Sequence, residues 1–333
     1  MTRRTILGAL GCLLLGACSG APPVPPKTAL SPLATGDLAG LVPAPGLAYL
    51  VLLKPREIAQ IPWLIPSIGS IAPEENLNRF KTQTGLDLRQ ISEAVIVHFG
   101  EAFDGADLQL VRHDGKASAI EKLFQKRLVK GAHRTEDRAD VVRLSGQIGT
   151  HGQTLARLGD DVVAFQEGGN LERGPARVAA LFATGRLKKT PRALDVEPLK
   201  SLRARFGNAP VIALAKGPFQ DEWKRGARGL LEAATGVGAA ARPTAREHIG
   251  FAIALSGDFQ QSGAAASEVL LGAWDDFASS EMGHLLGLDR PIERPLTTFS
   301  DDAISVNVEI EPNRFVQGLK ALVTEDLDAI MKL

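Results

Sequence analysis

The chain has 333 residues, with 38 basic and 38 acidic side chains, 44% hydrophobic residues and 5% aromatic residues. This length suffices for one large or two ordinary domains, and the composition is that of a globular protein. The balanced charge and the low aromatic content argue against nucleic acid as a partner. Cys12 and Cys18 are the only cysteines, so the globular part has no side chain for a disulfide, a thiolate zinc site or a cysteine nucleophile.

The N-terminus has the order of parts found in an export signal. Arg3 and Arg4 precede a short apolar stretch, Ile6 to Leu15, which is too short for a permanent membrane span of about 20 residues. The stretch leads into Leu15-Gly16-Ala17-Cys18, which resembles the bacterial lipobox. The resemblance implies that residues 1–17 are a lipoprotein signal peptide, and that Cys18 carries a diacylglycerol and becomes the acylated, palmitate-bearing N-terminus.

The residues around the lipobox indicate how the protein is exported and to which membrane it is sorted. Ser19, which is not Asp, resembles the sorting residue of lipoproteins that reach the outer membrane. The Arg3-Arg4 pair fits either a twin-arginine signal or an ordinary positive n-region. Removing residues 1–17 leaves 36 basic against 38 acidic residues. The proline-rich residues 18–29 predict an extended tether between the lipidated Cys18 and the body.

Residues 30–190 form the first predicted half. Continuous or alternating apolar runs predict strands at 47–53, 91–99, 108–112, 141–144, 154–158 and 162–166. Helical spacing of apolar residues predicts helices at 76–84, 118–128 and 176–182, with Gly85 as a C-cap glycine. Short turns between successive strands favour antiparallel pairing.

Residues 191–333 form the second predicted half, and they partly repeat the first. Residues 45–50 (PGLAYL) align with 209–214 (APVIAL), and Asp160-Asp161 aligns with Asp301-Asp302. Each acidic pair precedes a strand and then an amphipathic helix, the last of which has Asn313 as its predicted N-cap. We therefore expect an α+β fold, with antiparallel sheets, helices on one face and two tandem related halves. The body resembles uncharacterised envelope lipoproteins built from duplicated halves, and that resemblance assigns no functional residue.

The sequence lacks the common catalytic motifs. None of HExxH, GxSxG, a phosphate-binding loop or a dinucleotide-binding glycine motif is present. His98 falls within an apolar strand and is interpreted as a core residue, whereas His113-Asp114-Gly115 is typical of a turn. Gly236 and Gly238 are interpreted as turn or helix-end glycines. We expect no metal site, no cofactor and no catalytic residue.

One apolar segment differs from the rest of the chain. Residues 58–71 carry no charge and contain two prolines, which interrupt a continuous helix. Side chains this apolar must be buried or offered to a partner. The segment is interpreted either as a stretch packed across the sheet or as a lid or patch that binds a ligand or partner through Ile61, Trp63, Leu64, Ile65 and Ile68.

These observations favour a non-catalytic envelope lipoprotein held at a membrane by its lipid. The body then binds either an apolar ligand or an envelope protein. The sequence leaves open a structural or assembly component of an envelope complex, and also a hydrolase with a dispersed site.

Overall fold

A computed structural model of the chain describes residues 31–259 and 263–330. The chain divides at Leu33, and the fold concerns the part from Leu33 onward. Cys18, the predicted lipidation site, lies outside the described residues. Among the described residues, no helix combines the length and the apolarity needed to cross a bilayer.

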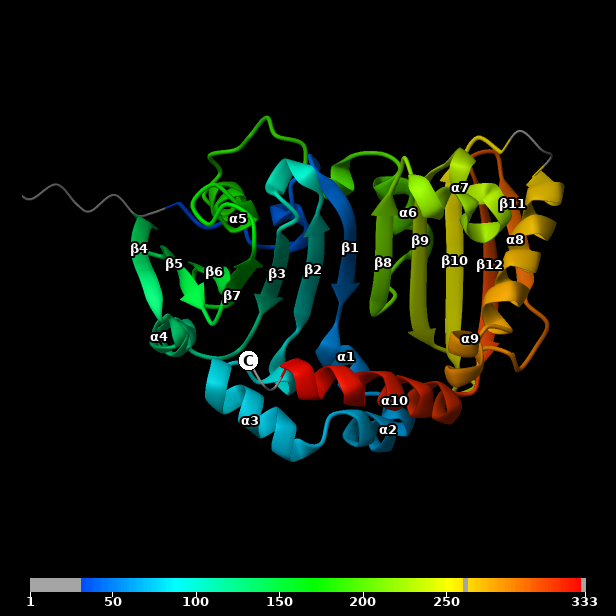
Figure 1. Cartoon of the computed structure of the whole chain (residues 1–333), viewed down its shortest axis with the longest axis horizontal. Helices are drawn as coiled ribbons and strands as arrows, with labels where there is room; N and C mark the ends of the chain where they lie inside the picture. The colour runs from blue at the N-terminus through cyan, green and yellow to red at the C-terminus, as the bar shows by residue number, and fades with distance from the viewer. Residues whose placement is uncertain (1–30, 260–262, 331–333) are drawn as a thin grey trace, which may run out of the picture. The chain divides into compact units, whose positions relative to one another are not determined.

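The strands of the described chain form one twelve-stranded sheet in the order β11-β12-β10-β9-β8-β1-β2-β3-β7-β6-β5-β4 (Figure 1). Every pairing within it is antiparallel, which confirms the predicted α+β class. The strands are β1 (Leu47–Leu53), β2 (Glu93–Phe99), β3 (Asp107–Arg112), β4 (Lys130–Arg138), β5 (Val141–Ile148), β6 (His151–Leu158), β7 (Val162–Glu167), β8 (Val211–Lys216), β9 (Ala234–Pro243), β10 (Ile249–Gly257), β11 (Leu296–Ser300) and β12 (Ala303–Ile310).

The helices lie between the strands and at the end of the chain. They are α1 (Pro55–Ala59), α2 (Ile65–Ile71), α3 (Glu74–Thr84), α4 (Ala117–Arg127), α5 (Pro175–Ala183), α6 (Leu199–Phe206), α7 (Leu230–Ala233), α8 (Gly263–Ala278), α9 (Glu281–Leu285) and α10 (Pro312–Ile330). Short 3-10 turns include η1 (Ala39–Leu41), η2 (Pro62–Leu64) and η6 (Asp221–Gly229). Gly85 ends α3 in the left-handed conformation, as predicted.

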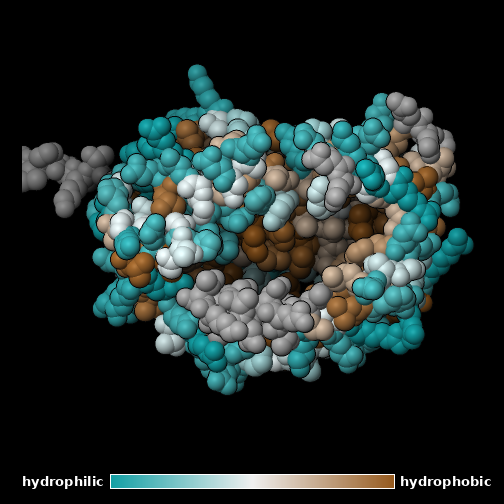
Figure 2. All heavy atoms as spheres, in the orientation of Figure 1, coloured by the Kyte–Doolittle hydropathy of each residue, from teal (hydrophilic) through white to brown (hydrophobic). Residues whose placement is uncertain are grey.

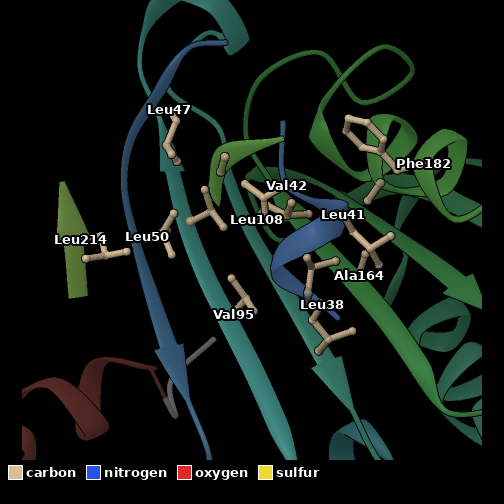
Figure 3. Packing of buried hydrophobic residues seen from close by; sticks show 14 of the residues in the cluster. Leu38, Leu41, Val42, Leu47, Leu50, Val95, Leu108, Ala164, Phe182 and Leu214 are labelled. Carbon is tan, nitrogen blue, oxygen red and sulfur yellow. The ribbon is translucent and has the colours of Figure 1, made fainter. Parts of the chain in front are cut away.

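One face of the sheet is closed by α5, α6 and η1. Leu50 of β1 and Leu214 of β8 are paired with each other in the sheet, and both point to this face. Both are fully or almost fully buried. Leu38, Leu41 and Phe182 belong to the same buried cluster and lie on its helical side, as Figure 3 shows. Burying apolar area at about 25 cal/mol per Å² makes this cluster the main stabilising part of the body.

The opposite face carries two smaller clusters. One gathers under α8 and α10 and includes Leu255, Trp274 and Ile304. The other gathers at α4 and includes Ile120, Phe124 and Leu155. Helices therefore cover parts of both faces of the sheet rather than one, because the central strands carry apolar residues on both sides.

The strand order is related over four strands on each side of the junction between β1 and β8, which we call the centre. From β1 outward it runs β1-β2-β3-β7, and from β8 outward β8-β9-β10-β12. The two residues that the sequence alignment equates, Leu50 and Leu214, are paired with each other across the centre. The backbone oxygen of Asp161 accepts from the amide of His113, and that of Asp302 accepts from the amide of Gly257. A duplication would produce these relations, and the duplication itself stays a prediction.

Three local predictions were wrong. Gly236 and Gly238 lie inside β9, where an added Cβ would overlap Pro198 and the ring of Phe206. The glycines thus let α6 approach the sheet. The backbone amides of Asn313 and Arg314 each donate a hydrogen bond of 3.0 Å to the carboxylate of Glu311. Glu311 rather than Asn313 therefore caps α10.

Strand β4 was not predicted. Its nine residues, KGAHRTEDR, have no apolar alternation, and the strand lies at the outer edge of the sheet. Charged residues at an edge discourage pairing with another chain.

Candidate functional site

The candidate site is the middle of the sheet face opposite α5 and α6. Side chains alternate between the two faces along a strand, so Tyr49 and Val51 point away from buried Leu50. Their partners in the register, Ala215 and Ala213, point to the same side. We call this surface the open face.

The open face consists of two rows that run across the strands. One row runs His98, Tyr49, Ala215, Val237, and the other runs Ile96, Val51, Ala213, Ala239, as the register pairs them. Tyr49 is 45% exposed and Ile96 is 38% exposed, and the other six are half-buried. Further along, the first row becomes buried at Leu255 and Ile304, and the second passes through half-buried Ile253 to buried Val306, where α8 packs on β12.

Figure 2 shows this region as a hollow with a hydrophobic floor, in the orientation in which β1, β8 and β9 face the viewer in Figure 1. The floor is deep because Ala213, Ala215 and Ala239 are small. At one side α10 is fixed to the sheet by Phe315, whose ring packs edge-on against Phe251 of β10 at 5.1 Å between centroids. The hollow is therefore concave and apolar, as small-molecule sites commonly are.

A polar group stands at one end of the open face. The ring of Tyr49 stacks on that of His98 at 5.3 Å between centroids, and His98 Nδ1 lies 2.8 Å from Oδ1 of Asp107. The His98 side chain is 35% exposed. The interpretation of His98 as a core residue is therefore wrong, because its side of β2 is the incompletely covered one.

The predicted ligand segment, residues 58–71, forms α1, η2 and α2 at the edge of the cluster under α8 and α10. Leu64 is buried there, while Ile61, Trp63 and Ile68 are partly buried against the same cluster. Ile65 is 54% exposed, and α2 contacts α10. The packing accounts for most of these apolar side chains, and their role toward a ligand or partner stays a prediction.

Three other titratable groups, His113, Asp161 and Asp302, lie away from the open face. His113 is 3% exposed, neither ring nitrogen has a hydrogen-bond partner among the described atoms, and burial lowers the pKa of its imidazole. Asp161 forms an ion pair with Arg112, and Asp302 forms one with Arg205. In the described part of the chain, no group of three or more metal-ligating side chains gathers.

Comparison with known proteins supports the fold. No protein-family model matches the chain, and no curated protein matches it in sequence. Its fold is similar to crystal form I of TP0453, with a TM-score of 0.50 and 10% identity over 89% of this chain and all of that one. Crystal form IV of TP0453 aligns with a TM-score of 0.48 and 10% identity, over 88% of this chain and 98% of that one. At this identity the likeness concerns the fold alone.

The sequence did not reveal the open face. Residues 47–53 are apolar at every position, a pattern typical of a strand buried on both sides. No local signal distinguishes Val51 from Leu50, because coverage of a sheet face depends on where distant helices dock.

Proposed function

We propose that this chain is a non-catalytic, membrane-tethered envelope lipoprotein that binds an acyl chain on the open face. The observation that carries the proposal is the contrast between the two faces of the same strands. Leu50 and Leu214 are sealed on one side, while Tyr49, Val51 and Ile96 stay accessible on the other. A monomeric protein rarely leaves a concave apolar surface of this kind without a use for it.

The chemistry of the hollow suits an amphiphile with one chain. Each methylene removed from water contributes about 0.8 kcal/mol, so about ten methylenes on the floor contribute about 8 kcal/mol before the cost of immobilisation. Tyr49, His98 and Asp107 provide hydrogen-bonding groups at one end, where a polar head would lie. No nucleophile stands beside the His98–Asp107 pair among the open-face residues, so the proposal contains no bond-breaking step.

The tether completes the proposal. A diacylglycerol on Cys18 supplies the two chains that stable membrane anchoring requires, and Ser19 directs the protein to the outer membrane. Mass spectrometry of the N-terminal peptide from the membrane fraction tests this. We expect the lipidated Cys18 in the wild-type chain and unprocessed chain in Cys18→Ser. An N-terminus at any other residue would refute the anchor.

Native mass spectrometry tests the ligand. The chain without residues 1–29 is expressed in a bacterial periplasm and measured as purified. We expect a reproducible adduct with the mass of a fatty acid or single-chain lipid. A clean apo mass, with no adduct after incubation with palmitate, would refute binding on the open face.

A matched pair of variants locates the adduct. Ala213→Leu raises the floor of the hollow and is expected to reduce the adduct at least tenfold. Ala132→Leu places the same side chain on exposed strand β4 and is expected to leave the adduct unchanged. Equal retention in both variants would place the ligand elsewhere.

The edge strand β11 favours a second candidate, a component of an envelope complex. Its five residues, LTTFS, carry no charge, and Leu296 and Phe299 are 67% and 60% exposed. An uncharged edge of this kind accepts an added strand from an extended segment of another protein, whereas charged β4 at the opposite edge opposes it. A photo-crosslinker at Phe299 in living cells should then capture one defined protein that a crosslinker at Thr135 of β4 does not capture. Identical patterns from both positions would exclude this role.

A further inference from the structure

A cavity of about 500 Å³, widely open to solvent, lies between α9 and the beginning of α10 and shares no lining residue with the open face. Its volume falls within the range of about 300–1,000 Å³ that is typical of sites for small organic ligands. The polar side chains that line it are His284, Asp289, Arg290, Arg314 and Gln317.

Two glycines hold the walls of the cavity together. Gly287 has a φ of +69°, and a Cβ there would lie 2.8 Å from the Cβ of Arg314. A Cβ on Gly318 would overlap the backbone oxygen of Leu285. Because neither position has room for a larger residue, α10 packs directly on the segment after α9, and the cavity walls are fixed by backbone contacts.

The side chains that line the cavity include more basic groups than acidic ones. Asp289 is the one carboxylate among the described residues that line the cavity, and it already has two partners, with His284 Nδ1 at 3.0 Å and Arg290 Nε at 3.6 Å. The hydrogen bond from His284 is the main cause that lowers the pKa of Asp289, so the carboxylate stays ionised and holds the ring in place.

Arg314 differs from Asp289 in this respect. Among the residues whose side chains the structure describes, no carboxylate lies within ion-pair distance of its guanidinium. The nearby carboxylate of Glu311 accepts from the amides of Asn313 and Arg314, where it caps α10. Gln317 lies one turn further along α10 and lines the same cavity. The cavity thus holds two guanidinium groups, an imidazole and an amide against a single, already paired acid.

We propose that this cavity binds the phosphate group of an organic phosphate. Arg314 and Arg290 supply the planar donors that match phosphate oxygens, and Gln317 adds a neutral donor. His284 uses Nδ1 toward Asp289, which leaves Nε2 for the ligand. The remaining volume accommodates the organic part. The phosphate comes either from a soluble ester or from a lipid headgroup, and the site does not depend on the binding of an acyl chain to the open face.

Calorimetry on the full chain in dodecyl maltoside tests the proposal. The probes are inorganic phosphate, glycerol 3-phosphate and dihexanoyl phosphatidylglycerol. We expect saturable binding of at least one of the two esters. Arg314→Gln and Arg290→Gln should each weaken it about 10- to 100-fold, because each removes a charged hydrogen-bond donor. Arg79→Gln, on exposed α3, is the matched control and should bind like the wild-type chain.

The two esters distinguish the source of the phosphate. Tighter binding of glycerol 3-phosphate identifies a soluble ester, and tighter binding of the phosphatidylglycerol identifies a headgroup. The proposal is overturned if neither ester binds at millimolar concentration, if both cavity variants bind like the wild-type chain, or if Arg79→Gln loses as much affinity as they do. Unchanged melting temperatures of the variants show that a loss of binding is not a loss of fold.

Discussion

Two adjacent alanines on β9 test whether one face of the sheet is closed and the other open. Ala240 is 2% exposed and lies in the cluster under α6, whereas Ala239 is half-buried and lies in an open-face row. Replacing each by Leu adds the same three carbons to the same strand. At Ala240 the addition overpacks a closed core and should cost about 1–3 kcal/mol. At Ala239 the side chain enters the hollow, and the change should stay within about 0.5 kcal/mol.

The assay is thermal unfolding followed by circular dichroism. A cost of 1–3 kcal/mol in a body of this size lowers the melting temperature by about 2–5 °C, so Ala240→Leu is measurably destabilised. Ala239→Leu should melt within about 1 °C of the wild-type chain and should lose the lipid adduct. Equal destabilisation of both variants would mean that the open face is packed like the closed one, and the reasoning about the hollow would fail.

Two further predictions concern stability. Burial lowers the pKa of His113, so the unfolded chain binds a proton below about pH 6.5 that the folded chain excludes, and stability falls as the pH drops through this range. His113→Phe should reduce this loss, measured as the difference between melting temperatures at pH 7.5 and pH 5.5. An unchanged difference would refute it. Gly238→Ala should destabilise by about 1–3 kcal/mol because its Cβ overlaps Phe206, whereas Gly69→Ala, with nothing within 4 Å in exposed α2, should stabilise by up to about 1 kcal/mol. A reversed order of melting temperatures would contradict the packing argument.

Local patterns predicted many of the elements. The strands at 47–53 and 162–166 and the helices at 118–128 and 176–182 are found within one or two residues of their expected bounds. In each of these strands and helices the apolar residues recur at the spacing typical of that type of element. The turns between them carry Gly or Asp. Strand β4 escaped prediction because its charged sequence reflects an edge position, which is a property of the assembled sheet.

The glycines of β9 show a second kind of failure. Gly236 and Gly238 have low strand propensity, and taken alone they are typical of turns. Their presence in the strand is explained only by the approach of Pro198 and Phe206, about 40 and 32 positions earlier in the chain. Likewise, the cavity between α9 and α10 joins Arg290 to Arg314, which no short motif connects.

The sequence by itself determined the class of fold, the antiparallel pairing of neighbouring strands, the expected lipid anchor at Cys18 and the absence of common catalytic motifs. These follow from periodicity, turn chemistry and residue identity, which are local properties. The tertiary structure alone decided that one side of β1 and β8 is sealed while the other is a hollow. The physical reason is that Leu50 and Val51 are both apolar, and their exposure differs because α5 and α6 dock on one face while no helix of the described residues covers the middle of the other.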